Sequence, residues 1–171
     1  MPNTFTLIAS STVGSGGAAS IDFTSIPGTY TDLLLKVSLR NALADVWDNA
    51  DISFNGSTTT YTNLQLRGNG STATSAKSTT QPAVNYWHVV SNNATASTFG
   101  NAEIYIPNYT GSVNKSVSID SVTENNATSA ADTLTAGLWG NTAAITSIKL
   151  QGNGSNFVQY STAYLYGIKK D

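Results

Sequence analysis

The alternation of apolar and polar positions is clearest near the end of the chain, over residues 157–168. Successive side chains of a β-strand point to opposite faces, so this run predicts one long strand that buries at least one face. Its length and aromatic content favour a central or barrel-closing strand against which earlier strands pair. One face of this strand would present Val158, Tyr160, Thr162, Tyr164, Tyr166 and Ile168.

Shorter runs of the same kind recur along the whole chain, separated by turn signals such as Ile26-Pro27-Gly28 and Asn55-Gly56, of which the second is a strong hairpin signal. No segment shows a helical period. We therefore predict a single all-β domain over residues 1–171, a jelly-roll-like β-sandwich of about ten short antiparallel strands. The expected strands before the last run are 5–9, 20–23, 32–39, 51–54, 61–66, 86–90, 102–106, 116–122, 134–139 and 144–150.

Three segments lack a strand pattern. Residues 40–50 are expected to be irregular, and residues 71–81, which are low in complexity, are expected to form an exposed loop. Residues 1–19 begin with a short apolar run and continue into a Gly-rich stretch. They could form an edge strand or a flexible arm that orders on binding a neighbour, and both alternatives stay open.

One internal similarity links residues 61–71 (YTNLQLRGNGS) with residues 145–155 (ITSIKLQGNGS). An old duplication would place two similar strands at matching positions of a two-sheet fold. Coincidence in a chain rich in Gly, Asn, Ser and Thr is the other explanation, and it is favoured.

Charge is scarce in this chain of 171 residues. Charged residues make up 11% of it, about half the usual share, and hydrophobic residues make up 40%. Its eight Lys and Arg do not cluster and the net charge is −2, which argues against nucleic acid as a partner. No apolar run approaches the length of a membrane span, and no secretion signal is visible, so we expect no membrane partner and synthesis in the cytoplasm. The lack of Cys excludes disulfides and thiolate metal sites.

Catalytic patterns are absent from the sequence. His88 is the only candidate base for a nucleophile, it lies beside Trp87 in a predicted strand, and no G-x-S-x-G motif accompanies it. Nothing in the sequence pairs Glu103 or Glu124 with a second carboxylate, as glycoside hydrolysis would need. We therefore predict a protein that is not an enzyme, with no catalytic residue and no cofactor.

Two groups of residues are candidates for binding. Asp45, Asp48 and Asp51 are weak candidates for Ca²⁺, because their spacing does not match an EF-hand loop and Asp is common in turns, so no metal site is assigned. Trp47 and Trp87 are candidates for surface contact with a ligand such as a glycan, Trp47 because it lies in a predicted loop. The other large aromatic residues, among them Trp139, Tyr164 and Tyr166, are expected to fill a core or an interface.

Seven strand-and-turn motifs spread over nearly the whole chain carry a family resemblance. They are 21–33 (IDFTSIPGTYTDL), 52–56 (ISFNG), 66–71 (LRGNGS), 103–109 (EIYIPNY), 122–127 (VTENNA), 136–139 (AGLW) and 165–169 (LYGIK). Together they resemble small virion structural proteins of tailed bacteriophages, of the cyanobacterial and marine phage type.

The resemblance implies a non-enzymatic structural protein of the virion, assembled in the host cytoplasm. The first expectation is a capsid decoration or cement protein, a homo-oligomer and specifically a trimer, that binds across subunits of the major capsid protein. The alternatives are a carbohydrate-binding, host-adhesion module of a tail fibre or spike, and a structural component of the tail or baseplate. The family pattern supplies no catalytic residue to carry over.

Overall fold

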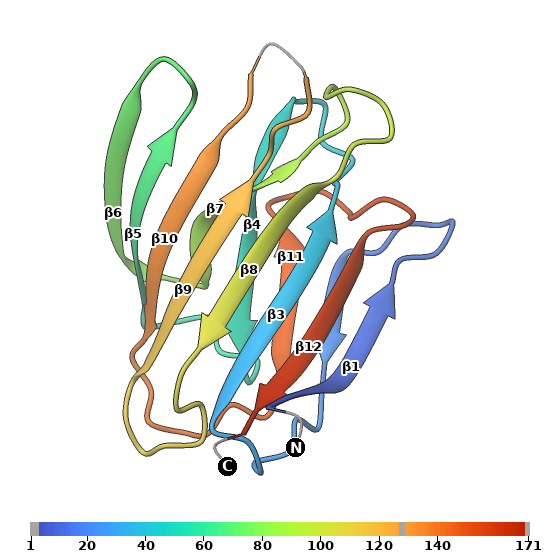
Figure 1. The fold of residues 1–171 in the computed structure, drawn as a ribbon. Coiled ribbons are helices and arrows are strands. Elements are labelled where there is room, and N and C mark those ends of the chain that lie inside the picture. The colour runs from blue at the N-terminus through green and yellow to red at the C-terminus, as the bar shows by residue number, and fades with distance from the viewer. Residues whose placement is uncertain (1–3, 127–128, 170–171) are drawn as a thin grey trace.

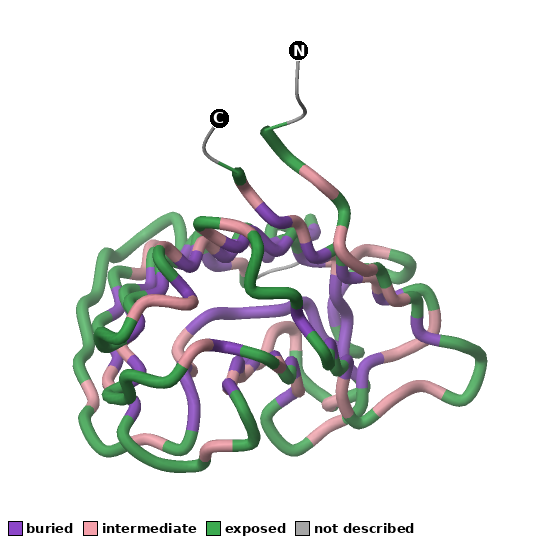
Figure 2. The backbone as a smooth tube through the Cα atoms, turned by 90° about the horizontal axis from the view of Figure 1, so that it is seen from below, coloured by how far each residue is buried: buried purple, intermediate pink, exposed green. Residues whose placement is uncertain are grey.

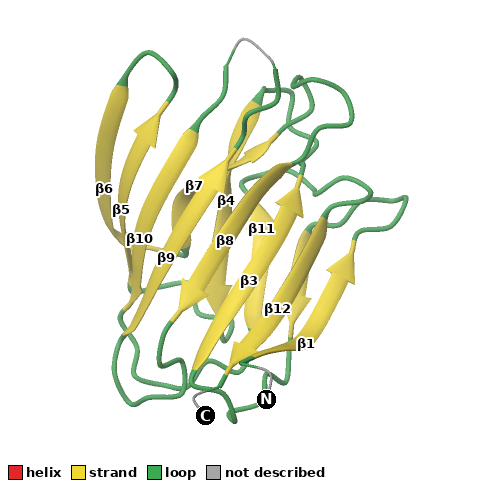
Figure 3. Cartoon of the chain, in the orientation of Figure 1, coloured by secondary structure: helices red, strands yellow, loops and turns green. Residues whose placement is uncertain are grey.

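The structure of the chain is a computed structural model that describes residues 4–126 and 129–169. These residues form twelve β-strands and no helix (Figure 3). The all-β prediction is therefore confirmed. Within the described residues, no helix is present that could cross a membrane.

The strands form two antiparallel sheets, one of eight strands and one of four, which we call the large and the small sheet. In Figure 1 the large sheet lies in front of the small one. In spatial order the large sheet contains β1 (Phe5–Thr12), β12 (Thr162–Ile168), β3 (Asp32–Leu39), β8 (Gly100–Ile106), β9 (Lys115–Val122), β10 (Asp132–Trp139), β5 (Tyr61–Gly68) and β6 (Ala73–Gln81). The small sheet contains β2 (Ser20–Phe23), β11 (Ile148–Gly152), β4 (Trp47–Phe54) and β7 (Val84–Val90).

The two sheets pack face to face, and the buried residues lie mainly between the two layers (Figure 2). The inward face of β3 shows the cause, because Leu33, Leu35, Val37 and Leu39 alternate with more polar positions and are all buried, as the pattern predicts. The β-sandwich prediction is thus confirmed. The strand orders do not establish jelly-roll connectivity, which stays a prediction.

An aromatic cluster fills the core between β4, β5 and β10. The ring of Trp139 stacks on that of Tyr61 at 6.2 Å between centroids and lies 5.7 Å from that of Phe54. The hydroxyl of Tyr61 accepts a hydrogen bond from the backbone N–H of Phe54 at 2.8 Å. The expectation that Trp139 fills the core is confirmed, since its side chain is almost fully buried.

The last strand is shorter than predicted, because β12 begins only at Thr162. Tyr160 has a φ of 71°, which breaks an extended conformation, and the preceding Phe157 turns into the core. The pairing prediction is confirmed, since β12 lies between β1 and β3. Its aromatic residues Tyr164 and Tyr166 lie on the outer side of the sheet, whereas Ala163 and Leu165 on the opposite side are buried.

Two segments expected to lack strands contain them. Residues 40–50 are not irregular throughout, because β4 begins at Trp47, and residues 71–81 contain β6, which pairs with β5. Every residue of β6 is exposed or half-buried, so this edge strand needs no apolar alternation that a sequence could display. The Asn55-Gly56 turn forms with positive φ at both residues, but it does not close a hairpin, because β4 and β5 belong to different sheets.

The first residues form an edge strand, so this alternative is correct for 5–12, while residues 1–3 lie outside the described part. The following loop is also tied down. Ala18 and Phe157 exchange backbone hydrogen bonds of 2.9 and 2.8 Å, and the N–H of Val13 donates to the carbonyl of Ser161. At the described ends, the N–H of Lys169 donates to the carbonyl of Thr4.

The two similar segments have opposite orientations in the fold. Leu64 on β5 is half exposed, whereas Ile148, its counterpart on β11, is buried. The shared part is the turn, where Gly70 and Gly154 have φ of 84° and 86°. Equivalent strands of a duplication would bury the same positions, so the structure favours coincidence.

Gly137 on β10 allows the small sheet to approach the large one. A methyl carbon added at Gly137 would lie 2.6 Å from Val84 Cγ1 and 2.7 Å from Val84 Cγ2, which is too close. We expect Gly137→Ala to lower the free energy of unfolding by about 1–3 kcal/mol, through overpacking. Urea denaturation would measure it, with Gly68→Ala as the control, because an added methyl at Gly68 meets nothing within 4 Å. Equal stabilities of the two variants would contradict this account.

Candidate functional site

The outer face of the large sheet is the candidate functional site, and the strand registers order its side chains into rows. Each row crosses the sheet and takes one residue from every strand. The charged row is Ser10, Tyr164, Lys36, Glu103, Asp120, Leu134, Leu66 and Ser75. The apolar row, two residues further along, is Leu7, Tyr166, Leu34, Tyr105, Ser118, Ala136, Leu64 and Lys77.

Polarity is inverted on β5 and β10. Leu64, Leu66 and Leu134 point outward and are 50%, 53% and 56% exposed. Their neighbours Asn63 and Gln65 point inward and are only 2% and 6% exposed. Because a register shift of one residue would exchange the two faces, this inversion needs a specific cause.

The cause is a set of hydrogen bonds that we call the polar seam, formed by Asn63, Gln65, Thr133 and Thr135 with β7. Strand β7 has a bulge opposite the stretch of β4 between Ala50 and Ile52. The bulge contains Tyr86, whose φ is 70°. The Tyr86 carbonyl accepts hydrogen bonds from Gln65 Nε2 at 2.7 Å and from Thr135 Oγ1 at 2.6 Å. Asn63 Nδ2 donates to Asn85 Oδ1 at 2.8 Å. These buried amides and hydroxyls have partners on β7, so β5 and β10 keep their polar side inward and their leucines outward.

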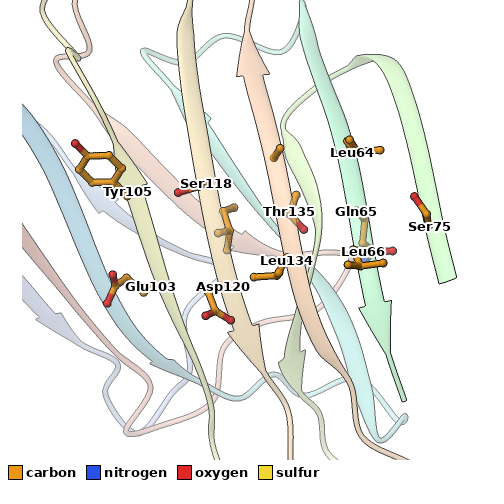
Figure 4. Close-up of a pocket in the computed structure, with 12 residues that line it drawn as sticks. Leu64, Gln65, Leu66, Ser75, Glu103, Tyr105, Ser118, Asp120, Leu134 and Thr135 are labelled. Atoms are coloured by element: carbon orange, nitrogen blue, oxygen red, sulfur yellow. The ribbon is translucent and has the colours of Figure 1, made fainter. Parts of the chain in front are cut away.

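The inversion leaves an open hollow of about 510 Å³ on the outer face (Figure 4). Its rim is formed by the leucines of β5 and β10 on one side and by Tyr105 of β8 on the other, while Ser118 and Ala136 between them are small. Exposed apolar surface of this kind, bordered by polar groups, is typical of protein interaction sites.

The charges of the outer face are not balanced. Lys36 forms an ion pair with Glu103, its cross-strand neighbour. On the other neighbouring strand, β9, Asp120 is the cross-strand neighbour of Glu103. Within the described residues Asp120 has no hydrogen bond or ion pair. Like charges opposite one another on neighbouring strands repel, so Asp120 favours a cation supplied from outside the chain.

The two tryptophans singled out in the sequence lie elsewhere. Trp87 is fully buried in the core, so its assignment to a surface contact is wrong. Trp47 is half-buried at the start of β4 instead of in a loop, and its Nε1 donates to Ser129 Oγ at 3.1 Å. The guanidinium carbon of Arg67 lies 5.2 Å from the centroid of the Trp47 ring, on which a sugar would have to stack.

The three aspartates do not converge. Asp45 and Asp48 each accept a hydrogen bond from the following backbone N–H, and Asp48 also accepts one from Asn41 Nδ2 at 2.8 Å. Asp51 lies further along β4 and is hydrogen-bonded to Gln151. Among residues 4–126 and 129–169, no three acidic, His or Cys side chains are grouped closely enough to hold a metal ion.

His88 is a packed residue of the interior. Its Nδ1 lies 2.7 Å from Thr133 Oγ1, and its ring meets that of Trp47 edge to face at 4.4 Å between centroids. Both His88 and Thr133 are almost fully buried, so this hydroxyl–imidazole pair is closed to a substrate.

Sequence reasoning missed the residues of the outer face. Leu64, Leu66 and Leu134 alternate with polar residues, and this pattern indicates a strand without showing which side is buried. Glu103 and Asp120 are distant in sequence, and only the register of β8 with β9 brings them together.

No protein-family model, no curated protein and no solved structure matches this chain. The resemblance to phage virion proteins therefore stays a prediction. The function has to be argued from the outer face itself.

Burial raises the pKa of Asp51 to about 6, and its Oδ1 has no hydrogen-bond partner within the described residues. The folded state therefore binds a proton that the unfolded state releases, so stability falls as the pH rises from about 4 to 6. We expect Asp51→Asn to raise the free energy of unfolding by about 2 kcal/mol at pH 7.5, a figure reduced for partial exposure, and to have little effect at pH 4. Urea denaturation at both pH values tests this, with exposed Asp45→Asn as the control. A stabilisation independent of pH would contradict it.

Burial, together with the nearby Arg67, lowers the pKa of His88 to about 4. Between pH 6.5 and 4 the unfolded state then binds a proton that the folded state does not bind. The free energy of unfolding therefore decreases as the pH is lowered from 6.5 to 4, by about 3 kcal/mol in total. Asp51 has the opposite effect over much of this range. We expect His88→Gln to become more stable as the pH falls from 6.5 to 4, whereas the wild type changes little. Urea denaturation curves across this range measure it, and a parallel profile for the two proteins would overturn the assignment.

Proposed function

We propose that this chain is a non-enzymatic structural protein of a tailed-phage virion, and specifically a capsid decoration or cement protein that works by docking onto other protein subunits. The observation that carries the proposal is the inverted polarity of β5 and β10. Leucines cover the outside of the large sheet, while Asn, Gln and Thr are buried beneath them. A monomer without a partner gains nothing from this arrangement, whereas a subunit of an assembly buries the leucines at its interface.

The composition supports the same proposal. A chain with 11% charged residues has few charges to desolvate when its surface is covered by neighbours. Docking by many copies on a repeating lattice gives a large total binding energy from a modest contact. The family resemblance supplies the kind of assembly, since it names virion structural proteins.

The carbohydrate-binding alternative has less support. Trp87 is buried, and the Trp47 ring already contacts Arg67 and His88. A structural role in the tail or baseplate uses the same docking chemistry as a role on the head. The two are distinguished by the location of the protein on the particle.

Immunogold electron microscopy with an antibody against this chain, on virions of the phage that encodes it, tests the proposal. We expect label over the head of intact particles. Virions assembled without the chain are expected to lose their genome at a lower temperature and after a milder osmotic shock. Label confined to the tail would replace the cement role by a tail role. No label on either intact or disrupted virions would overturn the virion assignment.

A further inference from the structure

We propose that the outer face of the large sheet is covered by a second copy of this chain, in a face-to-face dimer whose two-fold axis runs along β8. The inference rests on the proposed function, because it names the partner of the same face. It predicts a two-fold assembly in place of the trimer that the family resemblance implies.

The order of the strands makes this symmetry possible. β8 has β3, β12 and β1 on one side and β9, β10 and β5 on the other. A two-fold axis parallel to β8, lying between two facing sheets, preserves the position along the strands and exchanges the two sides. It therefore places β3 over the second copy's β9, β12 over its β10 and β1 over its β5, with each row facing its own equivalent. Two twisted sheets pack face to face in this way in ordinary sandwiches.

The charged row becomes complementary under this operation. Lys36 of each copy faces Asp120 of the other, which supplies the cation that Asp120 lacks. Glu103 lies at the axis, opposite Glu103 of the second copy, and each of these two carboxylates is neutralised by its ion pair with Lys36 of its own chain. Each lysine then lies between two carboxylates, so the Glu103–Asp120 repulsion within one copy is relieved by the other.

The apolar row is complementary in shape. On the β12 side it carries the large residues Leu34 and Tyr166, and on the β10 side it carries the small residues Ser118 and Ala136, over which the hollow of about 510 Å³ opens. The two-fold axis places Leu34 over Ser118 and Tyr166 over Ala136 of the second copy. The same operation sets exposed Leu7 over exposed Leu64, so large side chains of one copy fill the hollow of the other.

The face is large enough for a stable dimer. The seven strands from β1 to β5 span about 29 Å at the usual strand spacing, and strands of this length extend for about 24 Å. Each copy therefore offers roughly 700 Å² of face, close to the roughly 800 Å² per partner of a standard specific interface.

Sedimentation velocity of the purified chain over a range of concentrations tests the proposal, with a swap of charges as the decisive variant. We expect the wild type to be a dimer. Lys36→Asp and Asp120→Lys should each weaken dimerisation at least about tenfold, because each single change faces like charge against like charge at two symmetric positions. The double variant Lys36→Asp/Asp120→Lys should restore the dimer, since Glu103 can then pair with the lysine introduced at position 120.

A matched control exists on the small sheet, where Lys149 and Asp22 are cross-strand neighbours. Lys149→Asp/Asp22→Lys and its single variants should leave dimerisation unchanged, and circular dichroism would show that all variants fold. Leu134→Asp should give a folded monomer.

A wild type that is monomeric at all concentrations would overturn the inference and leave the outer face to a coat subunit. A dimer that Lys36→Asp and Asp120→Lys leave intact would overturn this geometry. Neither result changes where the antibody label falls on virions, so the proposed function fails or stands separately.

Discussion

The orientation of two strands of the large sheet, β5 and β10, depends on one backbone carbonyl. The bulge at Tyr86 turns this carbonyl out of the hydrogen-bonding pattern of the small sheet, and Gln65 and Thr135 donate to it from two neighbouring strands of the large sheet. A buried carbonyl without a donor costs more than a typical hydrogen bond contributes, so the two side chains are held inward. Because successive side chains of a strand point to opposite faces, the neighbouring residues Leu66 and Leu134 must point outward.

The sandwich accordingly has two kinds of interior. Around β3, β8 and β12 the interior is aliphatic, and Leu35, Ile104 and Leu165 are fully buried there. This part is stabilised by the burial of apolar surface. Beneath β7 the interior is polar, and each inward amide or hydroxyl depends on a specific partner. A polar interior of this kind contributes less to stability than an aliphatic one, but it fixes the register of β5 and β10 against β7. The aromatic cluster of Phe54, Tyr61 and Trp139 lies close to the junction of the two parts.

This division connects the fold to the proposed role. Placing the polar side chains inside releases leucines to the outer face, where seven neighbouring strands provide a broad surface for a second protein. The scarcity of charge elsewhere makes the few charges of this face more important. Lys36, Glu103 and Asp120 lie in one row at its centre, where they determine which partner and which orientation fit.

The sequence alone determined the content of the fold. Alternating runs predicted all-β structure, the bounds of β3 and its buried leucines. A strand that packs against the core with one face has an apolar residue at every second position, and this alternation is visible in the sequence. The pattern failed at β6, which buries nothing, and at residues 157–161, where Tyr160 turns the chain. On β5 it predicted the strand without its orientation. A period of two defines two faces but does not say which of them meets the other sheet. Only the tertiary structure decided this, since the partner of Gln65 is a carbonyl exposed by a bulge on a strand 21 residues away in sequence. The same holds for the row through Lys36, Glu103 and Asp120, which exists only because the registers of β3, β8 and β9 align three separate segments.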